Sequence, residues 1–528
     1  MLLHRLALTS RAVAAEPGRR AKTGLLADCL RELGPDEAPA AVALLSGESQ
    51  RLRTGLGPTA LRDLPPPAAA PRLGVRETER TLEAIAAVHG AGARAERHRL
   101  LTGLFERATD AEQAFLRAVL VGDLRQGALD AVVADAVARA AGVPAAAVRR
   151  ALMFRGSARA VAAAALTGGE AGLAAFRLEV GRPVRPMLAA AAPDVGTALD
   201  RLAAPAALEW KLDGIRVQVH RDGRDVGVFS RSLDDLTARV PEVVEAALAL
   251  PVDAAVLDGE AIALGPDGRP RPFQETAARA AARRDPERLR AEVPLSVRFF
   301  DLLHRDGGDL VDLPGRERWS ALAGTVPPGL RVARTETGDV AEALAFFEDA
   351  LAHGHEGVLV KDPAAGYRAG RRGAGWIKVK PRHTLDLVVL AAEWGSGRRR
   401  GFLSNLHLGA RAGGEPGLGP WVMLGKTFKG LTDETLAWQT GALLEREVER
   451  DAWTVRVRPE LVVEIAFDGV QRSPRYPAGL ALRFARVVRY RPDKSAAEAD
   501  TVAAVREIAA AEGLGRAPGT VGGPGRSD

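Results

Sequence analysis

The hydrophobic period of this chain changes near Arg182, and that change limits the folds the chain can adopt. Thr109 and Glu112 have the spacing of a capping box, and Gly142 and Pro144 are placed to end a helix. Before Arg182 apolar residues recur at helical spacing, as on the face made by Leu129, Val132, Val133, Ala136, Val137 and Ala140. The first 182 residues are therefore predicted to be helical.

After Arg182 the period is close to two. Helices are expected at 241–250 and 339–353, and strands are expected where β-branched and aromatic residues alternate between Gly, Asp and Pro. The predicted strands lie within 215–221, 225–231, 255–264, 295–303 and 356–362. This pattern predicts an α+β domain of two packed sheets. Further strands between 385 and 491 indicate a small β-barrel, and the Gly- and Pro-rich end is predicted to be disordered.

Composition narrows the class of protein. Cys29 is the single cysteine, so neither a disulfide nor a four-cysteine zinc site can form within one chain, which fits a reducing cytoplasm. The net charge of +6 suits a polyanionic partner, although a dispersed excess of arginine explains it equally well. His4, Arg5 and Arg11 interrupt the apolar start, which predicts the first amphipathic helix of a soluble enzyme and no membrane partner.

Lysine is scarce, and its positions are informative. Of 73 Lys plus Arg residues only eight are lysine, and one of them, Lys211, lies in the segment EWKLDGIR. Arginine stays charged, whereas the pKa of a lysine can be lowered until its amine is a nucleophile. Chance placement of solvated lysines is the alternative for any one of them. Lys211 is nevertheless the strongest candidate for a catalytic group.

Further short motifs follow Lys211 in a fixed order: SRSLDD (230–235), LDGE (257–260), FFDLL (299–303), EGVLVK (356–361), WIKVK (376–380) and RPDK (491–494). This succession resembles the covalent nucleotidyltransferases, and among them the ATP-dependent DNA ligases of the bacterial three-domain kind. RPVRPMLA (182–189) before the lysine, and GRRRGFLSNLHLGA and GKTFKGLTD after it, extend the resemblance over almost the whole chain.

The resemblance implies a multidomain fold. It has an all-α DNA-binding domain at 1–182, an α+β nucleotidyltransferase (adenylation) domain at 183–384 and a β-barrel OB-fold domain at 385–508, before a tail at 509–528. It implies sealing of nicks with a 5′-phosphate and a 3′-hydroxyl, in DNA repair, replication or recombination. ATP would be the substrate and would give a lysyl-AMP on Lys211, and Mg²⁺, with Mn²⁺ as an alternative, would be the metal. The partner would be nicked double-stranded DNA, and the enzyme would be a monomer.

For Lys211 to attack, its ammonium must lose a proton, and nearby positive charge would lower its pKa. Lys378 and Lys380 are expected on one face of a strand, where they would lower that pKa and hold the α-phosphate. The resemblance places the adenine at Glu209 and Phe300, with Phe299 as the alternative stacking ring. It places the ribose at Arg216 and Glu260, and phosphates at Arg231 and Arg372.

Paired carboxylates suit Mg²⁺, and Glu260 and Glu356 are the expected ligands. By resemblance, Arg491, Asp493 and Lys494 in the last domain would orient the departing pyrophosphate. Gly122, Arg125 and Gly127 in LVGDLRQGALD, together with Arg231, would contact DNA, since glycines allow close backbone approach and arginine binds phosphate. Asp213 and Gly214 would shape the turn after the nucleophile.

Three other classes of protein share part of this motif pattern. An NAD-dependent ligase would need the four-cysteine zinc element that one cysteine cannot supply. An RNA ligase or capping-type nucleotidyltransferase does not normally carry so large a helical region before the lysine. A non-catalytic DNA-binding protein of the same fold would have damaged motifs, whereas Lys211, Glu260, Glu356, Lys378, Lys380 and Lys494 are all present.

Overall fold

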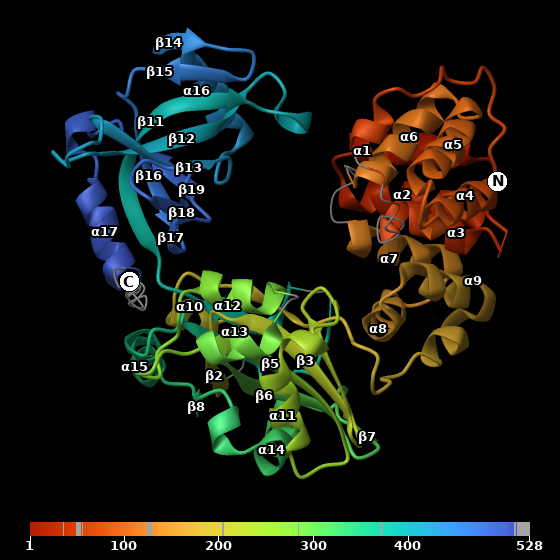
Figure 1. Cartoon of the computed structure of the whole chain (residues 1–528), viewed down its shortest axis with the longest axis horizontal. Helices are drawn as coiled ribbons and strands as arrows, with labels where there is room; N and C mark the ends of the chain where they lie inside the picture. The colour runs from red at the N-terminus through yellow and green to blue at the C-terminus, as the bar shows by residue number, and fades with distance from the viewer. Residues whose placement is uncertain are drawn as a thin grey trace, which may run out of the picture.

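The structure is a computed structural model, and it shows three parts along the chain (Figure 1). It describes residues 1–34, 36–48, 54, 56, 58–122, 124, 129–202, 205–282, 285–369, 372–511 and 514. For residues 58, 59, 129, 130, 372–374, 398 and 511 only the backbone is described.

The first part is built from helices around one apolar core. Its α-helices are α1 (Leu3–Ala15), α2 (Arg19–Arg31), α3 (Ala38–Ser46), α4 (Val75–Ala87), α5 (Ala93–Glu106), α6 (Asp110–Val121), α7 (Leu129–Ala141), α8 (Ala145–Arg155) and α9 (Ala158–Ala174). The predicted capping box at the start of α6 is confirmed, because Thr109 N donates to Glu112 Oε2 at 2.8 Å. On the predicted face of α7, Val132, Val133, Ala136 and Val137 are buried and Ala140 is partly buried, and Gly142 (φ 68°) ends that helix. No helix in the described ranges is long and apolar enough to cross a membrane.

Two five-stranded sheets form the middle part. One has the order β1 (Leu188–Ala191), β10 (Arg372–Val379), β9 (Val358–Lys361), β2 (Ala206–Trp210), β8 (Arg334–Thr337). The other has the order β4 (Asp225–Ser230), β3 (Ile215–Asp222), β5 (Ala254–Ala263), β6 (Leu295–Arg305), β7 (Gly308–Asp309). The five strands predicted here are all confirmed. One hydrophobic cluster contains Ile262 and Phe300 from the second sheet and Trp376 from the first, so the two sheets pack on each other.

Helices cover this pair of sheets. The expected helices are confirmed as α11 (Pro241–Leu248) and α15 (Val340–Ala352). The pattern did not reveal α10 (Val195–Leu199), α12 (Phe273–Ala281), α13 (Pro286–Glu292) and α14 (Gly315–Thr325). Alternating side chains explain the arrangement of the strands: in β10 Trp376 faces the other sheet, whereas Ile377 and Val379 pack with Ala343 of α15.

The last part is mostly strands around a second core. Its longest strand, β11 (His383–Trp394), pairs with β16 (Val462–Phe467) along its first half and with β12 (Leu403–Arg411) and β15 (Thr454–Val457) along its second half. The remaining elements are β13 (Trp421–Thr427), α16 (Asp433–Leu444), β14 (Glu447–Arg450), β17 (Gly469–Arg472), β18 (Leu480–Arg483), β19 (Arg486–Tyr490) and α17 (Val502–Ala511). The prediction of a disordered tail from 509 is wrong at its start, because α17 continues through Ala511. Residues 515–528 lie outside the described residues.

Candidate active site

Lys211 stands at the end of β2, where two loops are bonded together. Its backbone N–H donates to Gly357 O at 2.8 Å, and Glu356 N–H donates to Lys211 O at 2.9 Å. These two bonds bring the EWKLDGIR and EGVLVK motifs side by side although 145 residues separate them. The result is an ion pair between Lys211 Nζ and Glu356.

Glu356 also binds a second lysine. Its Oε1 pairs with Lys380 Nζ, which follows β10 directly, and Lys380 lies 3.5 Å from Asp468 of the last part. Lys378 precedes it by two residues, so both side chains lie on the side of β10 opposite Ile377 and Val379. The WIKVK motif thus lies beside Lys211 as predicted, with the Glu356 carboxylate between Lys211 and Lys380.

The expected lowering of the Lys211 pKa is wrong for the site without nucleotide. Burial alone lowers the pKa of Lys211, but attraction and a hydrogen bond from Glu356, with smaller contributions from Glu260 and Asp213, raise it above its ordinary value. Burial, together with Lys380 and Lys211, lowers the pKa of Lys378. The ion pair with Glu356 thus outweighs the effect of the neighbouring lysines on Lys211.

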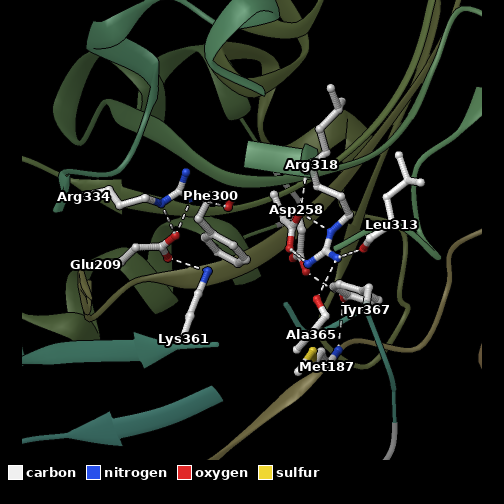
Figure 2. A network of polar contacts seen from close by, with 12 residues as sticks. Met187, Glu209, Asp258, Phe300, Leu313, Arg318, Arg334, Lys361, Ala365 and Tyr367 are labelled. Carbon is white, nitrogen blue, oxygen red and sulfur yellow. Dashed lines mark hydrogen bonds and ion pairs between the residues drawn. The ribbon is translucent and has the colours of Figure 1, made fainter. Parts of the chain in front are cut away.

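Arg216 is held on three sides. It binds Asp258 through two parallel bonds, Nε to Oδ1 at 2.9 Å and Nη2 to Oδ2 at 2.5 Å, and it donates to Met187 O at 2.6 Å. Tyr367 donates to Asp258 Oδ2 at 2.7 Å and completes the group (Figure 2). Tyr367 and Asp258 have no counterpart among the predicted site residues, although Asp258 lies inside the quoted LDGE motif.

Glu260 faces Arg216 across the β3–β5 pair. Burial raises the pKa of Glu260 to about 7, with Lys211 and Arg216 lowering it and Asp258 and Glu356 raising it further. Among the described residues it has no hydrogen-bond partner. Glu260 is therefore a carboxyl group near Lys211 that is free to bind an incoming hydroxyl or cation.

Glu209 and Lys361 form a buried pair deeper between the sheets. Lys361 Nζ lies 2.5 Å from Glu209 Oε2 without hydrogen-bond geometry, and Arg334 donates to Glu209 Oε1 at 2.8 Å. The ammonium of Lys361 lies 4.7 Å from the centre of the Phe300 ring, and Figure 2 shows this ring beside the Glu209 pair. Burial lowers the pKa of Lys361, with Arg334 also lowering it and Glu209 opposing.

The two candidate stacking rings differ in their surroundings. Phe299 is fully buried in the core on the helix-covered side of the second sheet, whereas Phe300 faces the first sheet and contacts Arg216 and Trp376. A pocket of about 590 Å³ is lined by Phe299, and not by Phe300, together with Trp210 and Leu212, which flank Lys211 in the chain. Its lining includes three buried nitrogens without a hydrogen-bond partner among the described residues: Trp210 Nε1, Arg331 Nε and His355 Nδ1.

Several predicted residues are not gathered at Lys211. Arg491 and Lys494 both bind Asp386 in the last part, and Asp493 binds Arg491. Arg231 is exposed in the turn after β4. Gly122 (φ 80°) caps α6, and Arg125, Gly127 and the Arg372 side chain lie outside the described residues.

Comparison with known proteins identifies the family. Three family models match in order: "DNA ligase N terminus" at 64–138, "ATP dependent DNA ligase domain" at 186–380 and "ATP dependent DNA ligase C terminal region" at 399–494. A "Probable DNA ligase" of Anaeromyxobacter sp. (strain K) is 57% identical over 96% of this chain and 99% of its own length. Another, from Mycolicibacterium gilvum, is 58% identical over the same shares. The solved structure "Pmar-Lig_PreS3" is similar in fold, with a TM-score of 0.58 at 17% identity over 92% of this chain and 99% of that one. The chain therefore belongs to the ATP-dependent DNA ligases.

Proposed function

We propose that the chain seals nicks bearing a 5′-phosphate and a 3′-hydroxyl in duplex DNA, with Lys211 as the nucleophile. In the first step the Lys211 amine bonds to the α-phosphorus of ATP, the bond to the β-phosphate oxygen breaks, and pyrophosphate and a proton leave. The AMP then passes to the 5′-phosphate of the nick, and attack by the 3′-hydroxyl forms the phosphodiester and releases AMP. The observation that carries this proposal is the contact of Lys211 with Glu356, which Lys380 shares, next to the free carboxyl of Glu260.

Deprotonation of Lys211 is the first requirement. The ion pair with Glu356 raises the pKa of Lys211, so weakening that pair is the event that would free the amine. Repulsion from Lys378, which interacts with Lys211, and from Lys380 would then favour the neutral form. Both lysines would also bind the α-phosphate.

The donor set fits a magnesium ion that arrives with ATP. Among the described residues no group of three or more His, Cys, Asp or Glu side chains is placed to hold a metal alone. Mg²⁺ in nucleotide sites commonly takes one or two carboxylates and completes its shell with phosphates and water. Glu260 and Glu356 are the two carboxylates that would serve, and the ion would neutralise charge on the phosphate oxygens.

The nucleoside would occupy the space between the two sheets. We assign the adenine to Phe300 and Glu209, since Phe300 rather than Phe299 faces the other sheet. The pocket beside Trp210 has the volume of a small-ligand site, but its lining contains Phe299 and neither Phe300 nor Glu209. Glu260 and Arg216 would bind the ribose, and Arg372 the phosphate.

Each of the three parts would have its own role in nick sealing. In this proposal residues 1–182 are an all-α DNA-binding domain, 183–384 the adenylation domain and 385–508 an OB-fold domain. Gly122, Arg125, Gly127 and Arg231 would contact the duplex, and Arg491, Asp493 and Lys494 would orient pyrophosphate. The separation of these last three from Lys211 then requires a movement of the last domain during the first step.

Incubation of the purified chain with α-labelled ATP, GTP or NAD tests the proposal. We expect covalent label from ATP in the wild type and in Lys22→Ala, a control in the first part, and none in Lys211→Ala. Lys211→Ala is expected still to seal a nick that is already adenylated, because the nucleophile is needed only in the first step. Normal self-labelling of Lys211→Ala would refute the assignment, and label from GTP alone would favour a capping enzyme.

A further inference from the structure

Asp386 binds two cations of the RPDK motif at once. Its Oδ2 lies 2.5 Å from Lys494 Nζ and 3.1 Å from Arg491 Nη1, and its Oδ1 lies 3.3 Å from the same Arg491 nitrogen. Asp386 is 105 residues before Arg491 in the sequence and belongs to β11, so no short motif contains the group. One carboxylate therefore sets the separation between these two cations.

The position of Asp386 is itself fixed by the fold. Its backbone N–H donates to Asp500 Oδ2 at 2.7 Å, and Asp500 N–H donates back to Asp386 O at 2.8 Å. In the sheet Asp386 pairs with Glu464 of β16, which in turn pairs with Arg489 of β19. The carboxylate is buried, so its direction follows the strands rather than the solvent.

Arg491 keeps N–H groups for a ligand in this arrangement. Asp493 accepts hydrogen bonds from Arg491 Nε at 2.9 Å and from Arg491 Nη2 at 2.6 Å, and Asp386 accepts one from Arg491 Nη1. A guanidinium has five N–H donors and an ammonium has three, so each cation retains donors after these contacts. The side chains of Arg491 and Lys494 are 16% and 30% exposed, which leaves both of them accessible from solvent.

We propose that Asp386 is a positioning residue that holds Arg491 and Lys494 at the spacing needed to bind the pyrophosphate group. This inference rests on the proposed function, since it requires that the two cations act on pyrophosphate during lysyl-adenylate formation. Flexible side chains lose conformational entropy when a ligand immobilises them. Because Asp386 already holds Arg491 and Lys494 in place, less entropy is lost when pyrophosphate binds. Asp386 acts through Arg491 and Lys494, without contacting the nucleotide itself.

Asp386→Asn tests the proposal, because the amide keeps the shape and removes the charge. Single-turnover lysyl-adenylate formation from ATP should slow by about 10-fold or more, as expected when a residue that orients a functional group is removed. Reversal of isolated lysyl-AMP by added pyrophosphate should need a correspondingly higher pyrophosphate concentration. Sealing of a pre-adenylated nick should change by less than about 3-fold, because pyrophosphate takes no part in it. Asp386→Glu should restore part of the loss.

Two controls separate positioning from folding. Glu415→Gln breaks an ion pair with Arg506 in the same part of the chain. It should leave unchanged the rate of lysyl-adenylate formation, the pyrophosphate concentration needed for its reversal and the rate of sealing the pre-adenylated nick. In a mutant cycle, Asp386→Asn should add little to a variant in which both Arg491 and Lys494 are alanine, because the carboxylate acts through these two residues, whereas independent structural damage would give an additive loss. Additive losses, or equal losses in adenylation and in sealing of the pre-adenylated nick, would overturn the proposal. Absence of self-adenylation in the wild type would instead refute the proposed function.

Discussion

Glu260 shows how one residue can favour function over stability. Its folded-state pKa of about 7 lies above the value near ~4.3 of an unfolded glutamate, so between these values the folded chain binds more protons than the unfolded chain. The free energy of unfolding must then fall as pH rises through this window. A charged Glu260 is costly to hold in this buried position, and an incoming ribose or cation would relieve that cost.

We therefore expect Glu260→Gln to stabilise the nucleotide-free protein. The gain should reach roughly 2 to 3 kcal/mol at pH 8 and fall below about 1 kcal/mol at pH 5, because the wild-type carboxyl is already protonated there. Thermal unfolding at both pH values measures this, and lysyl-adenylate formation should be lost in the same variant. Glu245→Gln, which breaks an exposed pair with Arg290, is the control and should show no such pH dependence. A variant that is less stable than wild type at pH 8 would contradict the burial argument.

At the residue scale the sequence predicts which side chains matter better than it predicts their partners. Lys211, Glu356 and Lys380 are all found from short motifs, and the structure brings them together. The carboxylate between the two lysines could not be foreseen, since it depends on how β2 and β9 are bonded 145 residues apart. Asp258 as the partner of Arg216 is a consequence of strand register, which local sequence does not fix.

At the scale of elements, the start of β9 depends on a single glycine. Gly357 has φ 136°, and a Cβ there would lie 2.3 Å from Val379 O and 3.1 Å from Lys380 Cα. Its carbonyl accepts the Lys211 N–H. Any side chain at this position must therefore push β9 away from the end of β10, and so separate Glu356 from Lys380.

Gly357→Ala should slow lysyl-adenylate formation by about 100-fold, since a displacement near 1 Å in an active site has effects of that order. Single-turnover labelling with ATP measures it. Gly324→Ala in α14 is the matched control, because no atom lies within 4 Å of its added Cβ and alanine favours a helix. Wild-type adenylation by Gly357→Ala would show that the site tolerates movement of β9.

The elements that pattern reading found are those with a strong period. Apolar and polar residues alternate along most of β3 (IRVQVHRD), and the apolar face of α7 repeats over three turns. Among the helices missed in the middle part, α13 buries none of its residues, so its sequence carries no apolar stripe. Short helices between strands are stabilised by what they pack against, which a single sequence does not show.

At the scale of the whole molecule, the proposed boundary at residue 182 crosses a shared core. Met153 and Phe154 of α8 pack in one cluster with Val184, Met187 and Leu303 of the middle part. Arg185 N–H also donates to Met153 O at 2.9 Å. The helical part is thus attached through α8, and a cut at 182 would expose apolar surface on the remaining fragment.

The last part contacts the site through two pairs of its own. Arg483 lies 3.1 Å from Asp213, two residues after Lys211, and Asp468 lies 3.5 Å from Lys380. The RPDK residues are bound to Asp386 in this same arrangement. One orientation of the last part therefore places β17 and β18 near Lys211, and a different orientation is needed to bring Arg491 there.

These contacts predict how two truncated chains should differ. A fragment of residues 143–528 keeps α8 and should form lysyl-adenylate within about 3-fold of the full-length rate, because the groove and its supporting cluster are intact. A fragment of residues 183–528 lacks Met153 and Phe154, and removing two buried side chains of this size should cost roughly 5 kcal/mol or more and lower its melting temperature clearly.

Both fragments should bind nicked duplex far more weakly than the full chain, and with a shallower dependence on salt, if the helical part supplies phosphate contacts. Calorimetry, single-turnover labelling and nick binding at several salt concentrations test the three statements separately. Nick binding by the 143–528 fragment as tight as that of the full chain would refute a DNA-binding role for the helices, while equal stability of the two fragments would show that α8 belongs energetically to the first part.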